Sequence, residues 1–449
     1  MADLTALWEV GLPLAGAGGG LGYAKVRAPR VFWSVAGLPV ARVRFAVTYR
    51  ATMDVCGLTV QPSRLRAFLV RNVARRSDVQ PVPPKIRRVR GSSTGMRVTL
   101  RLPAGLEPSD VIAASERLRH AWGVHSVHVV ATKPGFVELR MTGYDVLRRV
   151  KMPRRRPSGP MVVPVALRED GTAFVRDYLK VPHALTLGAN QSGKSMYLRN
   201  LIKELARLRV ALVGIDCKRG VEQRRYAPRL SALAVTPEEA SGLLDALVGE
   251  MEDRFDLLST YGAEDLWALP AEVRPVPIVL LVDEVAELFL VAVKKDEERR
   301  DRMVMQLIRL GQMARSAGIY LEICGQRFGS ELGKGATTLR AQLTGRVVHR
   351  VNDKQTADMG LGDIAPDAVV AVTTIPPDKP GVAVAGDSSG GWSRIRTPEL
   401  TTEEAAEICA QFAHLTPALP ALAPYRPVIP TVVPAAGSVP LVKPVPATD

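Results

Sequence analysis

The stretch "LGANQSGKS", residues 187–195, constrains the fold of this chain more than any other. Its G-x-x-x-x-G-K-[ST] spacing is that of a phosphate-binding loop, whose backbone N–H groups surround phosphates. An apolar run, "HALTL", precedes the loop, and a helical pattern, "SMYLRNLIKELARL", follows it. Such a loop works between a strand and a helix N-terminus, because the helix dipole also favours an anion. The sequence therefore predicts a nucleotide site on an α/β fold.

Each position of the loop has an expected role. Lys194 would reach the β- and γ-phosphates, and the Ser195 hydroxyl would bind Mg²⁺. The cofactors expected are therefore ATP and Mg²⁺. The predicted nucleotide-binding residues are those of the whole loop: Gly188, Ala189, Asn190, Gln191, Ser192, Gly193, Lys194 and Ser195.

Two adjacent acids supply the second half of the predicted site. In "PVPIVLLVDEVAEL", residues 275–288, five apolar residues lead to Asp283 and Glu284. Asp283 is placed to hold Mg²⁺ through water, and Glu284 to polarise the attacking water as a general base. An Asp-Glu pair after an apolar strand is typical of ATPases that hydrolyse many ATP molecules, whereas kinases and most GTPases lack the Glu. This pair favours a motor, although a surface pair of acids remains the alternative.

A third apolar run, within "AGIYLEICGQRF" at residues 317–328, ends at Gln326. The Gln326 side chain is placed to hydrogen-bond the γ-phosphate or the catalytic water and so to report the nucleotide state. A structural bridge at the end of a strand is the other interpretation, and the sequence leaves both open.

Strand and helix patterns alternate from about residue 160 to 410. Because each strand pattern is a near-continuous apolar run, we expect a parallel sheet covered on both faces. A smaller unit with β-α-β-β order is predicted over residues 95–145. From Leu415 onward the chain is rich in Pro, Ala and Val, which predicts a disordered tail. The expected domains are a basic region of unassigned fold (1–80), a small α/β module with a basic linker (81–160), an ATPase (161–414) and the Pro-rich tail (415–449).

Charge is distributed unevenly along the chain. The net charge is +15, and residues 1–160 hold 27 Lys and Arg against 9 Asp and Glu. Residues 161–449 hold 33 against 36, so the excess positive charge lies in the first third. This imbalance predicts a polyanionic partner there, which is either nucleic acid or an anionic lipid surface.

Two observations bear on location. The four cysteines are far apart and form no CxxC, which excludes a zinc-finger or disulfide framework and indicates a reducing compartment. The apolar runs Val10–Gly22 and Val31–Ala41 are shorter than the ~20 residues of a spanning helix. We therefore expect a cytoplasmic protein, with peripheral docking of the N-terminal region on a membrane or a membrane protein as an open alternative.

Further motifs occur in a fixed order around the phosphate loop and the paired acids. They are "GIDCKRG" with Asp216 and Lys218, "EMEDRF", "RLGQMARSAGIYLEICGQR" and "LTGRVVHRVNDKQTADMGLG". Over about residues 160–410 the chain resembles the FtsK/SpoIIIE family of ring-forming double-stranded DNA translocases, and most of all its actinobacterial plasmid-transfer branch. The resemblance implies a RecA-like P-loop ATPase that assembles as a homo-hexamer. It implies that ATP hydrolysis moves double-stranded DNA in conjugative transfer or chromosome segregation.

By motif position, the resemblance implies that Arg346 is the arginine that acts on a neighbouring subunit's ATP, with Arg350 and Arg340 behind it. The chain departs from the family at Gln191, where Gly is usual, and at Gly325 and Phe328 beside Gln326. A Pro-rich segment also stands where the family has a winged-helix module. Two alternative functions remain: a type VII secretion-like ring ATPase that moves protein, and a nucleotide-gated docking protein with weak turnover.

Overall fold

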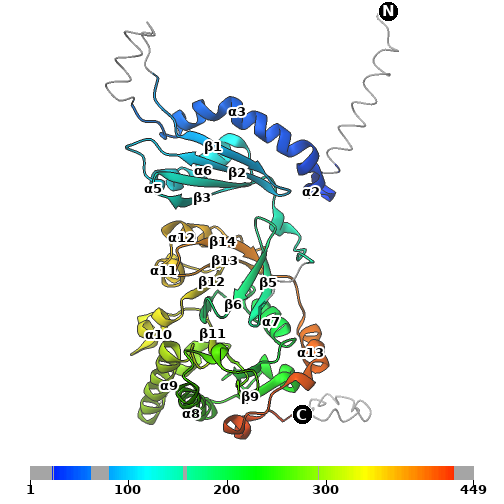
Figure 1. Ribbon diagram of the computed structural model, residues 1–449, viewed down its shortest axis with the longest axis vertical. Coiled ribbons are helices and arrows are strands. Elements are labelled where there is room, and N and C mark those ends of the chain that lie inside the picture. The colour runs from blue at the N-terminus through cyan, green and yellow to red at the C-terminus, as the bar shows by residue number, and fades with distance from the viewer. Residues whose placement is uncertain (1–22, 24, 62–79, 155–158, 292, 429–449) are drawn as a thin grey trace, which may run out of the picture.

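A small module of helices and one sheet stacks on a larger α/β part, which follows it in the chain (Figure 1). The computed structural model describes residues 23, 25–61, 80–154, 159–291 and 293–428. The apolar run Val10–Gly22 and the end of the expected tail, 429–449, lie outside the described residues.

The small module contains a four-stranded antiparallel sheet with the order β1-β2-β4-β3. Its expected β-α-β-β order is present, preceded by one further strand, β1. Because side chains alternate across a strand, β2 buries Met96, Val98 and Leu100 on one face. Its elements are α2 (Pro29–Phe32), a π-helical turn (Trp33–Gly37), α3 (Leu38–Val55), β1 (Lys85–Gly91), β2 (Gly95–Arg101), α5 (Pro108–Ala113), α6 (Ser115–Trp122), β3 (Ser126–Lys133) and β4 (Phe136–Thr142).

Helix α3 shares the core of this sheet. Its buried side chains Phe45, Tyr49 and Met53 form one apolar cluster with Trp122 of α6 and with the buried faces of the strands. The Phe45 and Trp122 rings lie 4.9 Å apart. The domain boundary expected at residue 80 therefore falls inside one packed unit, because α3 before it and the strands after it share a single core.

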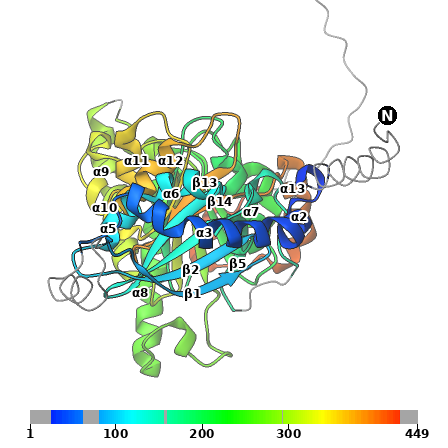
Figure 2. The same cartoon turned by 90° about the horizontal axis from the view of Figure 1, so that it is seen from above.

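The opposite side of α3 is exposed and apolar. Among the described residues, Pro29–Val55 is long and apolar enough to cross a membrane by length and composition alone, and only 11% of its most apolar window is buried. The apolar run expected to stop at Arg42 thus continues as a helix to Val55. Figure 2 shows α3 running across the outside of the module. The exposed valines of α3 are Val40, Val43, Val47 and Val55, and Val31 of α2 and Val35 of the π-helical turn are exposed just before them.

The larger part is built on a ten-stranded sheet with the order β6-β5-β14-β13-β12-β7-β11-β10-β8-β9. Strands from β12 to β9 run parallel, as expected, whereas β13, β14, β5 and β6 extend the sheet in antiparallel pairs that the sequence patterns did not predict. The strands are β5 (Val162–Arg168), β6 (Ala173–Asp177), β7 (His183–Leu187), β8 (Ala211–Ile215), β9 (Leu230–Ala234), β10 (Ile278–Val282), β11 (Ile319–Gly325), β12 (Gly345–His349), β13 (Val382–Gly386) and β14 (Trp392–Arg396).

Helices cover both faces of this sheet, which confirms the expected α/β class. Every residue of β7, β8 and β10 is buried, so successive side chains of one strand enter cores on opposite faces. In β8, for example, Leu212 packs in one core and Val213 in the other. The helices are α7 (Lys194–Leu205) and α13 (Thr402–Gln411) on one face, and α8 (Pro237–Tyr261), α9 (Lys294–Met313), α10 (Ala336–Gln342), α11 (Lys354–Leu361) and α12 (Pro366–Thr373) on the other.

The start of the Pro-rich segment packs on the ATPase instead of continuing as a tail. The Ser231 hydroxyl donates to the Pro417 carbonyl at 2.9 Å, and Leu422 is fully buried against the core. Prolines lack the N–H that a strand would use, yet the apolar side chains between them can still be buried. The expectation of disorder from residue 415 is therefore wrong for 415–428.

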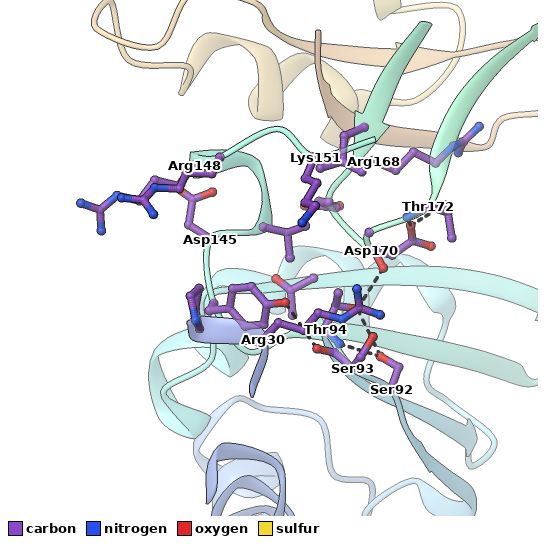
Figure 3. A pocket seen from close by; sticks show the side chains of 18 of the residues that line it. Arg30, Ser92, Ser93, Thr94, Asp145, Arg148, Lys151, Arg168, Asp170 and Thr172 are labelled. Carbon is purple, nitrogen blue, oxygen red and sulfur yellow. Dashed lines mark hydrogen bonds between the residues drawn. The ribbon is translucent and has the colours of Figure 1, made fainter. Parts of the chain in front are cut away.

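Hydrogen bonds, an ion pair and a ring contact join the small module and the segment that follows it to the larger part. The Thr94 hydroxyl donates to the Asp170 carbonyl at 2.9 Å, and Lys379 pairs with Asp145 at 3.0 Å. The His128 ring lies edge-on to the Trp392 ring, with 4.3 Å between their centroids. A cavity of about 1010 Å³ lies at this junction, and Figure 3 shows Arg30, Arg148, Lys151 and Arg168 among its lining residues.

We predict that Leu422→Ala destabilises the ATPase by about 2–5 kcal/mol, because it removes a fully buried side chain and leaves a cavity. Chemical denaturation of the full chain measures this change. Val428→Ala is the matched control, since Val428 is 89% exposed and its loss should leave stability unchanged. Equal stability of the two variants would contradict the packing described here.

Candidate nucleotide site

Parallel strands bring the loops of the site to one edge of the sheet. In the parallel registers, Gly325 of β11 lies opposite Leu187 of β7, and Val282 of β10 lies opposite Ile323 of β11. The carboxyl ends of these strands therefore coincide, and so do the loops that follow them. The phosphate loop, Gln326 and the Asp283–Glu284 pair meet there, although each comes from a different part of the chain.

The phosphate loop is held by backbone hydrogen bonds to its neighbours. The Gly188 N–H donates to the Gly325 carbonyl at 3.2 Å, and the Ala189 N–H donates to the Arg350 carbonyl at 2.9 Å. Gly193 has φ of 104°, and a Cβ there would lie 2.2 Å from the Gly381 nitrogen, so only glycine fits. Lys194 then begins α7, as the motif requires.

Gln191 occupies the loop position at which glycine is usual in the FtsK/SpoIIIE family, which the sequence resembles. It adopts the left-handed backbone conformation, with φ of 60°. This conformation costs a side-chain-bearing residue roughly 1–2 kcal/mol relative to glycine. The loop thus keeps the shape that a glycine would give it, but with local backbone strain.

Two lysines and one backbone N–H surround the Glu284 carboxylate. Lys194 Nζ lies 3.3 Å from Glu284 Oε2, and Lys218 Nζ lies 3.7 Å from the same oxygen. The Gln326 N–H donates to Glu284 Oε1 at 3.3 Å. Glu284 is buried, with 7% of its surface exposed, so these contacts act where water screens them little. The phosphate-loop lysine and the expected base are therefore in direct contact.

Asp283 is buried beside a second acid, Asp216. Burial and then the Asp216 charge raise the pKa of Asp283 to about 6, while Lys218 and Lys194 act in the opposite direction. Asp216 is fixed after β8 by accepting N–H groups from Lys218, Glu222 and Gln223. A divalent cation beside Asp283 would relieve the repulsion between the two carboxylates.

A cavity of about 530 Å³ lies over the phosphate loop and Asp283, and Glu284 lies just behind its lining, in contact with Lys194 and Lys218. Lys194, Ser195 and Asp283 all line it, which provides a hydroxyl and a carboxylate oxygen, the ligand types that Mg²⁺ prefers. The described residues contain no cluster of three or more His, Cys, Asp or Glu arranged for a metal. Such a cluster is not needed, because Mg²⁺ at phosphate sites uses one or two protein ligands together with the substrate phosphates.

Gln326 also lines the cavity, although its neighbours depart from the resembled family. Phe328 is fully buried and lies against the Phe289 ring, so it has become a core residue. A Cβ at Gly325 would lie 3.1 Å from Val285 and 3.4 Å from the Glu284 carboxylate. A side chain at 325 would therefore press on Val285 and would only touch Glu284.

Of the three candidate arginines, Arg340 and Arg346 bond within their own part of the fold, and Arg350 contacts the phosphate loop. Arg346 is 5% exposed, donates to the Arg340 carbonyl at 3.0 Å, and has its pKa lowered to about 10 by burial. Arg340 donates to the Phe328 carbonyl, and Arg350 donates to Asn190 of its own loop at 3.3 Å. In this conformation Arg346 points into its own subunit, whereas an arginine for a neighbour's site must reach the surface.

Sequence reasoning left out two parts of this site. Lys218 was matched only to the Asp-x-Lys motif of the resembled family, yet it contacts Glu284 and lines the cavity. The far wall, formed by Pro380 and residues 399–403, follows no apolar-strand motif and gave no signal. The Arg199 guanidinium holds this wall to α7 by donating to the Leu400 carbonyl at 2.9 Å.

Two family models match the chain in succession. The actinomycete conjugal transfer protein N-terminal domain matches residues 20–143, and the FtsK/SpoIIIE family matches residues 145–330. The first match spans the small module from α2 to β4, and the second contains the phosphate loop, the paired acids and Gln326.

Curated relatives agree with these matches. The transfer protein TraSA of Streptomyces ambofaciens is 54% identical over 417 residues, which are 90% of this chain and 100% of the relative. The sporulation regulatory protein of Streptomyces azureus is 70% identical over 60% of this chain and 89% of the relative. The DNA translocase FtsK of Caldanaerobacter subterraneus subsp. tengcongensis is 29% identical over 58% of this chain, a match that spans 38% of that protein's length.

A solved structure shares the fold. The pCW3 conjugation coupling protein TcpA, in its monomer form with ATPγS, aligns over 81% of this chain and 98% of its own with a TM-score of 0.53. The sequence identity is 18%, so this likeness concerns the fold alone.

We predict that Gln191→Gly retains nucleotide binding and does not lower the melting temperature, because glycine adopts a φ of 60° without strain. Gln191→Val should weaken nucleotide binding and lower the melting temperature, since a β-branched residue tolerates that conformation least. Thermal unfolding with and without Mg²⁺ and ATPγS measures both effects. If glycine proved as damaging as valine, the strained position would have been misassigned.

Proposed function

The chain belongs to the FtsK/SpoIIIE family, in its actinomycete conjugal-transfer branch, and from this membership we propose an ATP-driven motor that moves double-stranded DNA during conjugal plasmid transfer. The observation that carries the proposal is the contact of Lys194 and Lys218 with Glu284 at the edge where the phosphate loop ends. The arrangement places the candidate phosphate-binding lysine and the candidate general base side by side, so that one triphosphate could reach both.

The proposed site divides its work among its own residues. The loop N–H groups and Lys194 hold the phosphates, and Ser195 and Asp283 hold the metal. Bound Mg²⁺ would neutralise charge on the phosphate oxygens. Lys194 is then drawn toward the phosphates and leaves Glu284 free to orient and deprotonate a water molecule. Gln326, whose N–H contacts Glu284, is placed to sense whether that carboxylate has moved.

Assembly and location extend the proposal. We infer a homo-hexameric ring, with a subunit-bridging arginine among Arg340, Arg346 and Arg350. Arg346 would have to leave its buried position on assembly, whereas Arg350 is already half-exposed beside the phosphate loop. The exposed valines of α3 would place the small module against the cell membrane.

The function is tested by measuring ATP hydrolysis by the full chain with and without duplex DNA. We predict strong stimulation by duplex DNA of unrelated sequences, since contacts to phosphates carry no sequence information. Hydrolysis indifferent to DNA would point to a different cargo, as for a motor that moves protein. No turnover under either condition would leave a docking protein and overturn the proposal.

Two substitutions separate binding from chemistry. We predict that Lys194→Ala abolishes ATP binding, whereas Glu284→Gln retains binding and lowers turnover at least ~100-fold, the usual contribution of a general base. Glu252→Gln, a change at a partly exposed glutamate of α8 that pairs with Arg309, is the control and should hydrolyse ATP normally. Normal turnover by Glu284→Gln would show that another group serves as the base.

A further inference from the structure

One face of the small module's sheet packs on α3, and the other face carries a dense group of cations. Successive side chains of a strand point to alternate faces, and residues paired across strands point to the same face. The pairing of β1, β2, β4 and β3 therefore identifies the residues of this second face. All seven lysines and arginines of the group are exposed. We call this surface the basic face: Lys85, Arg88, Arg90, Arg97, Arg101, Lys133 and Arg140.

Several of these cations are directly opposite one another on adjacent strands. Arg90 pairs with Arg97, which pairs with Arg140, and in another row Lys85 pairs with Arg101. Neighbouring strands are about 4.8 Å apart, so these like charges are close. Like charges directly opposite across strands destabilise a sheet. Departures from such local rules are expected where function requires them.

Few acids offset this charge. Among the described residues of the face, Glu138 is the one acid, and it pairs with Arg140 at 2.7 Å. From the larger part, Asp170 pairs with Arg97 at 3.4 Å. Cations on an edge strand such as β1 also discourage sheet-to-sheet aggregation. That explanation does not extend to Arg97, Arg101 and Arg140, which lie on the interior strands β2 and β4.

The basic face continues into the junction cavity. Arg97 and Arg140 line that cavity of about 1010 Å³. Further cations that line it are Arg30 of α2, Arg148 and Lys151 between β4 and β5, and Arg168 of β5. Figure 3 shows Arg148, Lys151 and Arg168 on the far side of the cavity from the Ser92–Thr94 turn. Three acids also line it: Asp145 is paired with Lys379, Asp170 is paired with Arg97, and Glu169 accepts a hydrogen bond from the Ser126 hydroxyl. The positive surface therefore extends from the module onto the ATPase.

From this continuous surface we infer that the basic face binds the phosphate backbone of duplex DNA and leads it to the motor. The inference rests on the proposed function, in which DNA is the cargo. Two aromatic rings lie on the described part of the face. Lys133 covers the Phe136 ring at 4.4 Å, and the His128 ring is packed edge-on against Trp392 of the larger part. Proteins that read single strands on a sheet stack bases on several aromatic rings. This face lacks such a platform, so it contacts phosphates and not bases.

An anionic membrane is the competing polyanion, and the shape of the module argues against it. The exposed valines of α3 and the basic face lie on opposite sides of the sheet, and α3 lies on the side away from the ATPase (Figure 1). A flat bilayer contacts one side of the module only. If the valines of α3 contact a membrane, the basic face points away from that membrane and toward the ATPase. It is then accessible to duplex DNA and not to the lipid surface.

The test compares two triple variants of the full chain. Arg88→Gln, Arg90→Gln and Arg101→Gln together remove three cations from the basic face. Arg42→Gln, Arg50→Gln and Arg117→Gln remove three exposed cations from α3 and α6 on the other side of the sheet, with the same change of net charge. The affinity for a short fluorescent DNA duplex is measured without nucleotide across a salt series.

We expect the basic-face variant to bind duplex DNA at least ~tenfold more weakly than the control variant, with a slope of log K against log salt smaller by about 2.7, since each lost phosphate contact removes about 0.9. Its melting temperature should stay the same or rise, because opposing charges have been removed. Equal affinities of the two variants would overturn the inference, whether both keep or both lose binding.

Two further measurements separate the possible failures. DNA-stimulated hydrolysis by the wild type, with unchanged binding by the basic-face variant, would overturn only this inference and leave the proposed function standing. A wild type that neither binds duplex DNA nor responds to it would overturn both. A basic-face variant that loses binding to phosphatidylserine vesicles but keeps duplex binding would overturn the inference in favour of a lipid surface.

Discussion

The ion pair between Lys194 and Glu284 joins two residues that are 90 positions apart in the chain. It forms because β7, β11 and β10 lie side by side in parallel and end at the same edge of the sheet. Each of these strands is buried along its whole length, and a slip of one residue would exchange the two faces of a strand. The packing of two apolar cores therefore sets the register, and the register sets the distances within the site.

The same contact explains how a triphosphate would act on the site. Glu284 contacts two lysines, and a triphosphate would offer Lys194 a more highly charged partner. Lys218 remains beside the carboxylate and comes from the next strand, β8, so a movement of Glu284 would be felt on both neighbouring strands. Gln326, bonded through its backbone to the other carboxylate oxygen, lies on the remaining side. A nucleotide bound as proposed would therefore act on three strand ends at once.

Sequence patterns predicted the elements that have a local signature, such as a periodic run of apolar residues or a short motif. The phosphate loop and the buried strands were found because an apolar run before a glycine-rich turn leaves few alternatives. Strand β1 was missed because all seven of its residues are exposed, and four of them are Lys or Arg. The continuation of α3 past Arg42 and Arg44 was missed because Arg44 reaches the Ala121 carbonyl, a contact with a helix far along the chain. The burial of Leu422 and Arg346 likewise depends on tertiary packing, which no short pattern reports.

A structure of the chain with Mg²⁺ and a non-hydrolysable ATP analogue tests the central claim most directly. The account predicts Lys194 Nζ within hydrogen-bond distance of the β- or γ-phosphate, the metal between Ser195 and Asp283, and Glu284 released from Lys194. An analogue bound elsewhere, with the Lys194–Glu284 pair intact and Asp283 remote from the metal, would contradict it.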